Sequence, residues 1–359
     1  KDRRQALVAV DAVLVGDVVQ WMLEVDEAQL FAQRGGQHRA GQCVARQAFF
    51  DQYRGHHQEA AFGIDQRVLE RRVQVQRLVG GNGPGGGGPD HGKSFFAQAV
   101  QAEGGGWFGK GMFEVHYVTE VFRSAAAICY QNSGEVLPSE YGKFSTAVRF
   151  PMGVISVISP WNFPGILTAR GFAFAMAAGN TIVLKPSEDT PFVGGLYFAE
   201  ILEEAGVPAG IFNVVTCSRE NVAEVGDEMI EHPYVKGISF TGSTPVGRSI
   251  AAKAGAHLKK ACVELGGKDS LIILEDAEME RATQAANFGS FMHQGQICMS
   301  VEKVLVQESI YPEFLEKFAA RAARLKVGDS ADKDNVIGPL INDRQVTRVK
   351  AQLDAAIAK

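Results

Sequence analysis

Hydrophobic and polar positions follow a regular alternation from about residue 150 onward. Short apolar runs rich in β-branched residues, typical of buried strands, alternate with longer helix-like segments. Such an alternation indicates parallel βαβ units with helices on both faces of a sheet. The pattern therefore predicts the α/β class, with a Rossmann-like parallel-sheet cofactor domain. The expected strands are 153–159, 181–185, 211–215 and 237–243, and the expected helices are 164–178, 190–206, 219–231 and 245–255.

Residues suited to ligand binding follow these expected strands. Ligands of open parallel sheets bind at the carboxyl ends of the strands. Here those ends carry Trp161 and Asn162, the stretch from Lys185 to Glu188, and Gly242 with Ser243. We therefore expect a nucleotide site at this edge of the sheet.

The first 107 residues have a different composition. They contain no threonine, one serine and two lysines, but fourteen glutamines. Folded domains use serine, threonine and asparagine for caps and turns, and the glycine run at 80–88 supplies flexibility in place of packing. We expect residues 1–107 to be an atypical segment that is disordered or read from a non-native frame.

One motif in this segment suggests a different activity. Residues 87–94 match G-x-x-x-x-G-K-S, the loop that binds phosphates in P-loop nucleotide hydrolases. Seven residues of glycine, asparagine and proline separate the motif from the nearest strand-like run, and a glycine-rich tract matches the pattern easily by chance. A P-loop-type hydrolase remains the alternative enzyme.

The overall composition argues against several kinds of partner. A net charge of −5 gives no reason to expect nucleic acid, and no apolar run reaches the length of a membrane span. Five scattered cysteines without C-x-x-C spacing predict free thiols in a reducing cytoplasm and no metal site. They are Cys43, Cys129, Cys217, Cys262 and Cys298.

Five short motifs occur in a specific order in the rest of the chain. They are P-W-N-F-P at 160–164, K-P-S-E at 185–188, F-T-G-S-x-x-x-G at 240–247, E-L-G-G-K at 264–268 and G-Q-I-C at 295–298. Each alone is weak, but the ordered set resembles the NAD(P)-dependent aldehyde dehydrogenase superfamily from about residue 108 to the end. The resemblance implies a cofactor domain at 108–262, with an oligomerisation hairpin at 134–151, and a partial α/β catalytic domain at 263–359.

The resemblance also implies three catalytic residues. Cys298 would attack the aldehyde carbon as a thiolate, the best side-chain nucleophile near neutral pH. The amide of Asn162 and the backbone N–H of Cys298 would hold the resulting oxyanion. Glu264 would activate the water that hydrolyses the thioester.

Other motif positions would bind the cofactor. Lys185 and Glu188 would hold the adenosine ribose, and Ser243 the pyrophosphate. Because a carboxylate at position 188 would repel a 2′-phosphate, NAD is favoured over NADP. The full expected set is Trp161, Lys185, Glu188, Gly242, Ser243, Gly247 and Leu265.

The substrate is expected to be an aromatic aldehyde. The stretch from residue 114 to 171 is closest in texture to benzaldehyde, vanillin and salicylaldehyde dehydrogenases, and the residues beside the catalytic motifs are mostly apolar. Those expected to line a substrate tunnel are Phe163, Leu167, Arg170, Met292, Ile297 and Met299.

The chain also departs from the family pattern. It stops at Lys359, before the E-x-F-G-P stretch and the strand with which the hairpin at 134–151 would pair between subunits. We expect the complete protein to be a homo-oligomer and the chain as given to be nearly inactive. A third possibility is a non-catalytic relic that keeps the fold.

Overall fold

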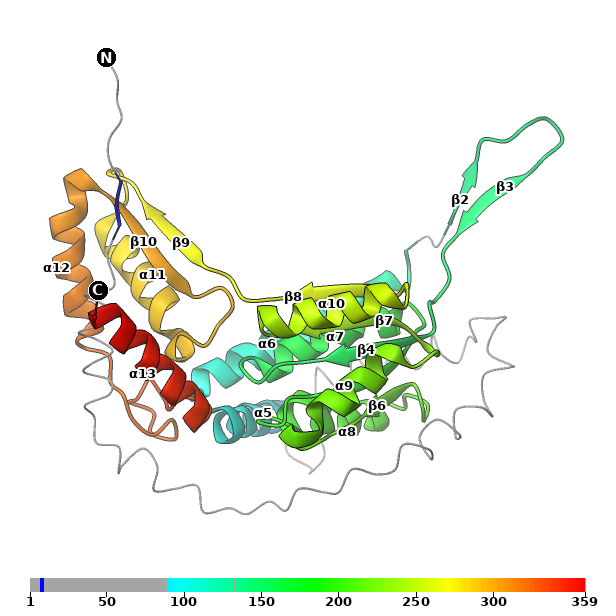
Figure 1. Ribbon diagram of the computed structural model, residues 1–359, viewed down its shortest axis with the longest axis horizontal. Helices are drawn as coiled ribbons and strands as arrows, with labels where there is room; N and C mark the ends of the chain where they lie inside the picture. The colour runs from blue at the N-terminus through cyan, green and yellow to red at the C-terminus, as the bar shows by residue number, and fades with distance from the viewer. Residues whose placement is uncertain (1–6, 10–88, 132–133, 359) are drawn as a thin grey trace. The chain divides into compact units, whose positions relative to one another are not determined.

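The computed structural model describes residues 7–9, 89–131 and 134–358 (Figure 1). Its described residues divide into two compact units: unit 1 contains residues 7–9, 100–111 and 266–358, and unit 2 contains residues 89–99, 112–131 and 134–265. The chain therefore passes from unit 2 to unit 1 between residues 265 and 266, three residues beyond the boundary expected from the sequence. The expected domain assignment itself stays a prediction.

Unit 2 is built on a five-stranded sheet. Its strands have the order β6-β5-β4-β7-β8, and every pairing between them is parallel. The alternation seen in the sequence thus corresponds to parallel βαβ units, and the predicted α/β class is confirmed. The strands are β4 (Val154–Ile158), β5 (Thr181–Lys185), β6 (Phe212–Val214), β7 (Val235–Thr241) and β8 (Lys260–Glu264).

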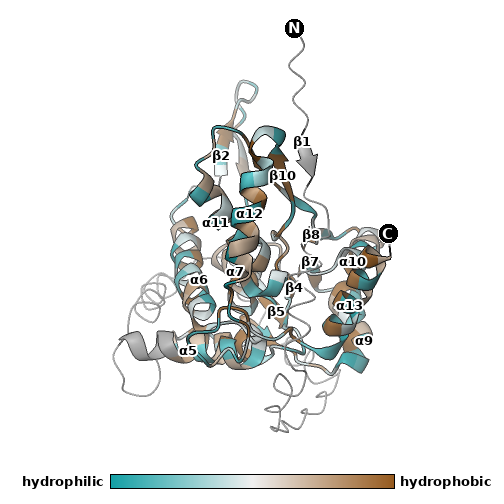
Figure 2. Cartoon of the chain, turned by 90° about the vertical axis from the view of Figure 1, so that its left-hand side faces the viewer, coloured by the Kyte–Doolittle hydropathy of each residue, from teal (hydrophilic) through white to brown (hydrophobic). Residues whose placement is uncertain are grey.

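Helices cover both faces of this sheet. Successive residues of a strand point to opposite faces, so neighbouring residues of β4 pack against different helices. Ile155 and Val157 of β4 pack with α6 (Phe108–Ile128), α7 (Pro164–Ala177) and α8 (Tyr197–Glu204). Val154 of the same strand packs with α9 (Val222–Glu231) and α10 (Thr244–Ala256) on the other face. The strands β4 and β5, which lie inside the molecule in Figure 2, are mostly apolar and buried on both faces, as is typical of a parallel sheet.

Unit 2 has three further elements outside this sheet. The strands β2 (Gly134–Leu137) and β3 (Ser145–Val148) form an antiparallel hairpin where the sequence predicts one. The segment predicted as one helix at 190–206 begins with a π-helical turn at Phe192–Leu196, before α8.

Helix α5 (Pro89–Gly104) lies inside the segment 1–107 that the composition marks as atypical. Its side chains Phe96, Ala97 and Val100 are buried, and the ring of Phe96 lies 5.4 Å from that of Tyr197. The end of that segment is therefore part of the folded chain. Of the P-loop motif, Gly87 and Gly88 lie outside the described residues, and the other six positions lie within α5.

Unit 1 contains a smaller mixed sheet. Strand β10 (Val301–Gln307) pairs in parallel with β9 (Asp269–Ile273) and antiparallel with β1 (Leu7–Ala9). The helices α11 (Met279–Phe291) and α12 (Tyr311–Ala322) contribute aromatic residues to its core, and α13 (Asp343–Ile357) follows later in the chain. Over the part of the chain that the structure describes, no helix has the length and apolar character needed to cross a membrane.

Candidate active site

The parallel sheet of unit 2 brings the ends of four motif-bearing strands to one edge. The last residue of β4, Ile158, is paired with Lys185 of β5 and with Phe240 of β7, and Thr241 is paired with Glu264 of β8. The motifs that follow these strands therefore start from the same edge of the sheet. Trp161 and Asn162, which follow β4, are half-buried there.

A glycine cradle surrounds the start of α10. A Cβ atom at Gly242 would lie 2.6 Å from the ring of Phe240, and one at Gly247 would lie 2.2 Å from Leu265 Cδ2. Ser243 is the N-cap of the helix, and its hydroxyl makes no capping hydrogen bond. A helix N-terminus with closely approaching backbone is suited to an anion such as a pyrophosphate. These residues fit a dinucleotide.

Charged side chains gather at the end of β5. Lys185 is 3% exposed, and its Nζ donates to the carbonyl of Pro186 at 2.9 Å. The same Nζ lies 3.9 Å from one carboxylate oxygen of Glu188, and the other oxygen accepts a 2.7 Å hydrogen bond from Arg219. Sequence reasoning found Lys185 and Glu188 but missed Arg219, which lies 31 positions from Glu188 along the chain.

The turn that carries Asn162 is held by a buried carboxylate from another helix. Phe163 is the N-cap of α7 and provides no side-chain capping bond. Instead Glu114 of α6, which is fully buried, accepts hydrogen bonds from Gly165 N at 2.8 Å and Ile166 N at 3.2 Å. The carboxylate thus satisfies two first-turn N–H groups and lies at the positive end of the helix dipole. Sequence reasoning missed this residue, although Phe163 is a poor N-cap and Glu114 stands directly between Phe113 and Val115.

Replacing Glu114 by alanine should therefore lower the free energy of unfolding by about 2–4 kcal/mol, because two buried N–H groups lose a charged acceptor. Glu114→Gln keeps one acceptor oxygen and should cost about half as much. Urea unfolding measures both, with Glu120→Ala, an exposed glutamate of the same helix, as the control. Equal effects of all three substitutions would show that Glu114 does not hold α7.

The loop that carries Cys298 belongs to unit 1 and contains a strained turn. His293, Gln294 and Gly295 have φ values of 51°, 58° and 69°. A left-handed conformation costs a non-glycine residue about 1–2 kcal/mol, so surrounding contacts must maintain it. His293 is fully buried, and the side-chain oxygen of Gln296 accepts a 3.1 Å hydrogen bond from Ile341 N.

Cys298 itself is half-buried. A Cβ atom at Gly267, in the E-L-G-G-K motif, would lie 3.3 Å from the Cys298 carbonyl oxygen, so glycine permits a close approach there. The predicted catalytic residues are divided between the units. Asn162 and the half-buried Glu264 lie in unit 2, and Cys298 lies in unit 1.

The residues expected around the substrate have different environments. Phe163 and Leu167 are buried, Met292 and Ile297 are half-buried, and Arg170 and Met299 are exposed. Phe291, also next to the catalytic loop, packs in the core of unit 1 against Phe318.

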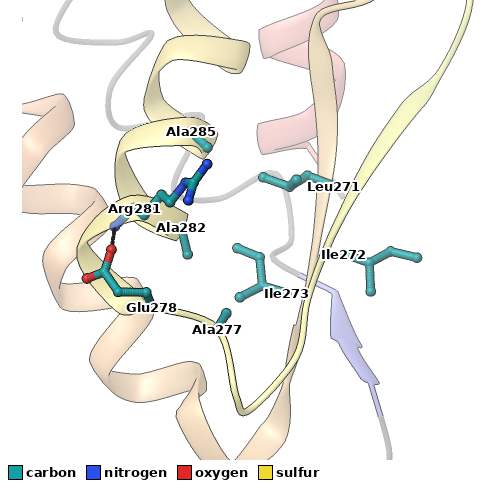
Figure 3. A pocket seen from close by; sticks show the side chains of 8 residues that line it. All are labelled: Leu271, Ile272, Ile273, Ala277, Glu278, Arg281, Ala282 and Ala285. Atoms are coloured by element: carbon teal, nitrogen blue, oxygen red, sulfur yellow. Dashed lines mark hydrogen bonds between the residues drawn. The ribbon is translucent and has the colours of Figure 1, made fainter.

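A separate pocket of about 230 Å³ lies between β9 and α11 in unit 1 (Figure 3). Its walls are mainly aliphatic, and the carboxylate of Glu278 caps α11 by accepting from Arg281 N at 2.9 Å. No residue predicted from the motifs lines this pocket. Among the described residues, no cluster of three or more His, Cys, Asp or Glu side chains is arranged to hold a metal ion.

Comparison with known proteins gives a consistent result. Residues 91–359 match the aldehyde dehydrogenase family. The chain is 48% identical over 259 residues to benzaldehyde dehydrogenase YfmT of Bacillus subtilis (strain 168). The aligned residues make up 72% of this chain and 53% of that protein. The chain thus spans about half the length of the curated relatives it matches.

Two solved structures extend the comparison. A salicylaldehyde dehydrogenase from Pseudomonas putida G7, complexed with salicylaldehyde, has a TM-score of 0.74 and 38% identity, over 81% of this chain and 59% of that one. An NAD-dependent benzaldehyde dehydrogenase from Corynebacterium glutamicum has a TM-score of 0.71 and 36% identity, over 79% of this chain and 59% of that one.

Proposed function

Because the chain belongs to the aldehyde dehydrogenase family, we propose that it oxidises an aromatic aldehyde to the carboxylic acid with reduction of NAD. The observation that carries this proposal is the common edge of the unit 2 sheet, where four of the ordered motifs begin. The relatives named for benzaldehyde and salicylaldehyde support the aromatic class of substrate. The P-loop alternative is not supported, since Gly92 to Ser94 fall within the family match.

The dinucleotide would be held at the edge of the sheet. In this proposal Gly242, Ser243 and Gly247 receive the pyrophosphate at the start of α10, and Leu265 closes the cradle. Lys185 and Glu188 hold the adenosine ribose, beside Trp161. When bound, the nicotinamide ring supplies an acceptor for the hydride of the substrate.

The chain's own residues carry out the other steps. The Cys298 thiolate forms a bond to the aldehyde carbon, and the carbonyl oxygen becomes an oxyanion that accepts hydrogen bonds from the Asn162 amide and the Cys298 N–H. Loss of hydride from that carbon leaves a thioester on Cys298. Glu264 then takes a proton from water, which attacks the thioester and releases the acid and the thiol.

The environment of the expected substrate residues supports an aromatic ring as the substrate. Phe163, Leu167, Met292 and Ile297 present apolar side chains, and Arg170 on α7 offers a cation to a ring hydroxyl or carboxylate. Met299 is 75% exposed and would be covered only when a ligand or another part of the protein lies over it.

The complete protein is proposed to be a cytoplasmic homo-oligomer. The hairpin of β2 and β3 has exposed apolar side chains, Val136 at 66% and Val148 at 53%, which suit a subunit interface. Among the described residues, the cysteines form no disulfide, which suits a reducing compartment; they are Cys129, Cys217, Cys262 and Cys298.

Formation of NADH on adding benzaldehyde, vanillin or salicylaldehyde and NAD to a longer version of the protein tests the activity, because the chain as given is expected to be nearly inactive. Aldehyde-dependent NADH that accumulates with a matching amount of acid is the expected result. Nucleotide binding without turnover, in the chain and in a longer version of the protein, would favour a non-catalytic relic. Phosphate release from ATP without NADH formation would favour a P-loop hydrolase.

A further inference from the structure

Glu188 shares its carboxylate with a second cation that the motifs do not contain. Arg219 follows β6, the strand next to β5, and its guanidinium donates to Glu188 at 2.7 Å. The Arg219 side chain is 62% exposed, whereas that of Glu188 is 21% exposed. The guanidinium is therefore largely open to solvent beside the mostly buried carboxylate of Glu188, and both residues belong to unit 2.

This pairing changes the charge that the ribose site presents. The argument for NAD over NADP treats Glu188 as an isolated carboxylate that repels a 2′-phosphate. With Lys185 at 3.9 Å and Arg219 at 2.7 Å, the three side chains have a net charge of +1. The repulsion is therefore offset on both carboxylate oxygens.

We propose that Arg219 determines cofactor specificity by binding a 2′-phosphate, so that this chain accepts NADP as well as NAD; this rests on the proposed dinucleotide site. A guanidinium forms two parallel hydrogen bonds with a phosphate and is the side chain best suited to that group. An exposed arginine–carboxylate pair is weak, so Arg219 can exchange Glu188 for a phosphate dianion at low cost. Without a 2′-phosphate, Arg219 stays on Glu188, which still accepts from the ribose hydroxyls.

Binding of two small nucleotides tests the proposal without any catalysis. Titration calorimetry of the full chain with ADP and with adenosine 2′,5′-bisphosphate measures the contribution of the 2′-phosphate directly. Both should bind, with dissociation constants within about tenfold of each other. Arg219→Ala should weaken the bisphosphate by about tenfold or more and change ADP binding less than about threefold.

Two further variants make the test specific. Arg123→Ala removes an arginine of similar exposure that pairs with Glu120 on α6, and it should change neither affinity. Glu188→Ala should tighten the bisphosphate, because Arg219 loses its competitor. Circular dichroism checks that each variant keeps its helices.

The outcomes separate this proposal from the dinucleotide site itself. ADP binding with exclusion of the bisphosphate from the unaltered chain would overturn the role of Arg219 and leave the site intact. Equal weakening of both nucleotides by Arg219→Ala would also overturn it, because Arg219 would then only orient Glu188. Failure of both nucleotides to bind the folded chain would overturn the dinucleotide site and this proposal together.

Discussion

Replacing Cys298 by alanine should abolish aldehyde-dependent NADH formation while nucleotide binding survives. Alanine cannot form the covalent bond to the aldehyde carbon, so the rate should fall on the order of 10⁴-fold or more. Binding should persist because Cys298 lies in unit 1, whereas the proposed nucleotide residues lie in unit 2. NADH formation and ADP titration calorimetry measure the two properties separately, in a version of the protein shown to be active.

Cys262→Ala is the matched control for this experiment. Cys262 is an exposed free thiol on β8, two residues from Glu264, and it should be dispensable. Activity that persisted in Cys298→Ala but disappeared in Cys262→Ala would show that Cys262, and not Cys298, is the nucleophile. Loss of ADP binding in Cys298→Ala would indicate instead that the substitution disturbs more than the catalytic loop.

The regular elements of unit 2 could be predicted from local sequence because their residues carry the periodicity of the final environment. Residues 182–184 are apolar and lie in β5, an inner strand of the sheet that is buried along its whole length. Pro164 and Gly179 bracket α7 as a first-turn proline and a left-handed glycine with φ of 92°. Such signals are local, so they can be read from the sequence without knowledge of the fold.

The features that refine the candidate site could not be predicted in the same way. Glu114 meets the start of α7 across 51 positions of sequence, and Arg219 meets Glu188 across 31. Neither contact has a local pattern, because each depends on how α6 and β6 are placed by the sheet. The left-handed residues His293 and Gln294 were equally hidden, since neither is a glycine that would signal positive φ.

Motif order and geometry also answer different questions. The ordered motifs identify the family because the whole set rarely occurs by chance, but they say little about how a side chain is oriented. The structure adds hydrogen bonds and close approaches, such as Gly247 against Leu265. The catalytic and cofactor-binding roles of individual residues stay predictions, and they are tested by substituting each residue.

Glu264→Gln should separate the two halves of the proposed reaction. Hydride leaves the substrate carbon before water attacks the thioester, so the first turnover does not require a general base at position 264. Loss of a general base typically lowers the rate about 10²–10⁴-fold. Here only the rate of thioester hydrolysis should fall. Rapid mixing should therefore show a burst of NADH equal to the concentration of active sites, followed by a very slow steady rate.

The side chain of Glu264 makes this substitution informative, because glutamine has nearly the same shape and retains an acceptor oxygen. Glu264 ends β8 and is half-buried, and its carbonyl oxygen accepts from Gly242 N at 3.0 Å through the backbone, which the substitution leaves in place. The nucleotide cradle should therefore persist, and ADP binding should be unchanged. Glu231→Gln, an exposed glutamate at the end of α9, is the control and should keep full steady turnover. Unchanged steady turnover in Glu264→Gln would remove Glu264 as the water-activating base. Loss of the burst together with turnover would place its role before the thioester, as an activator of Cys298.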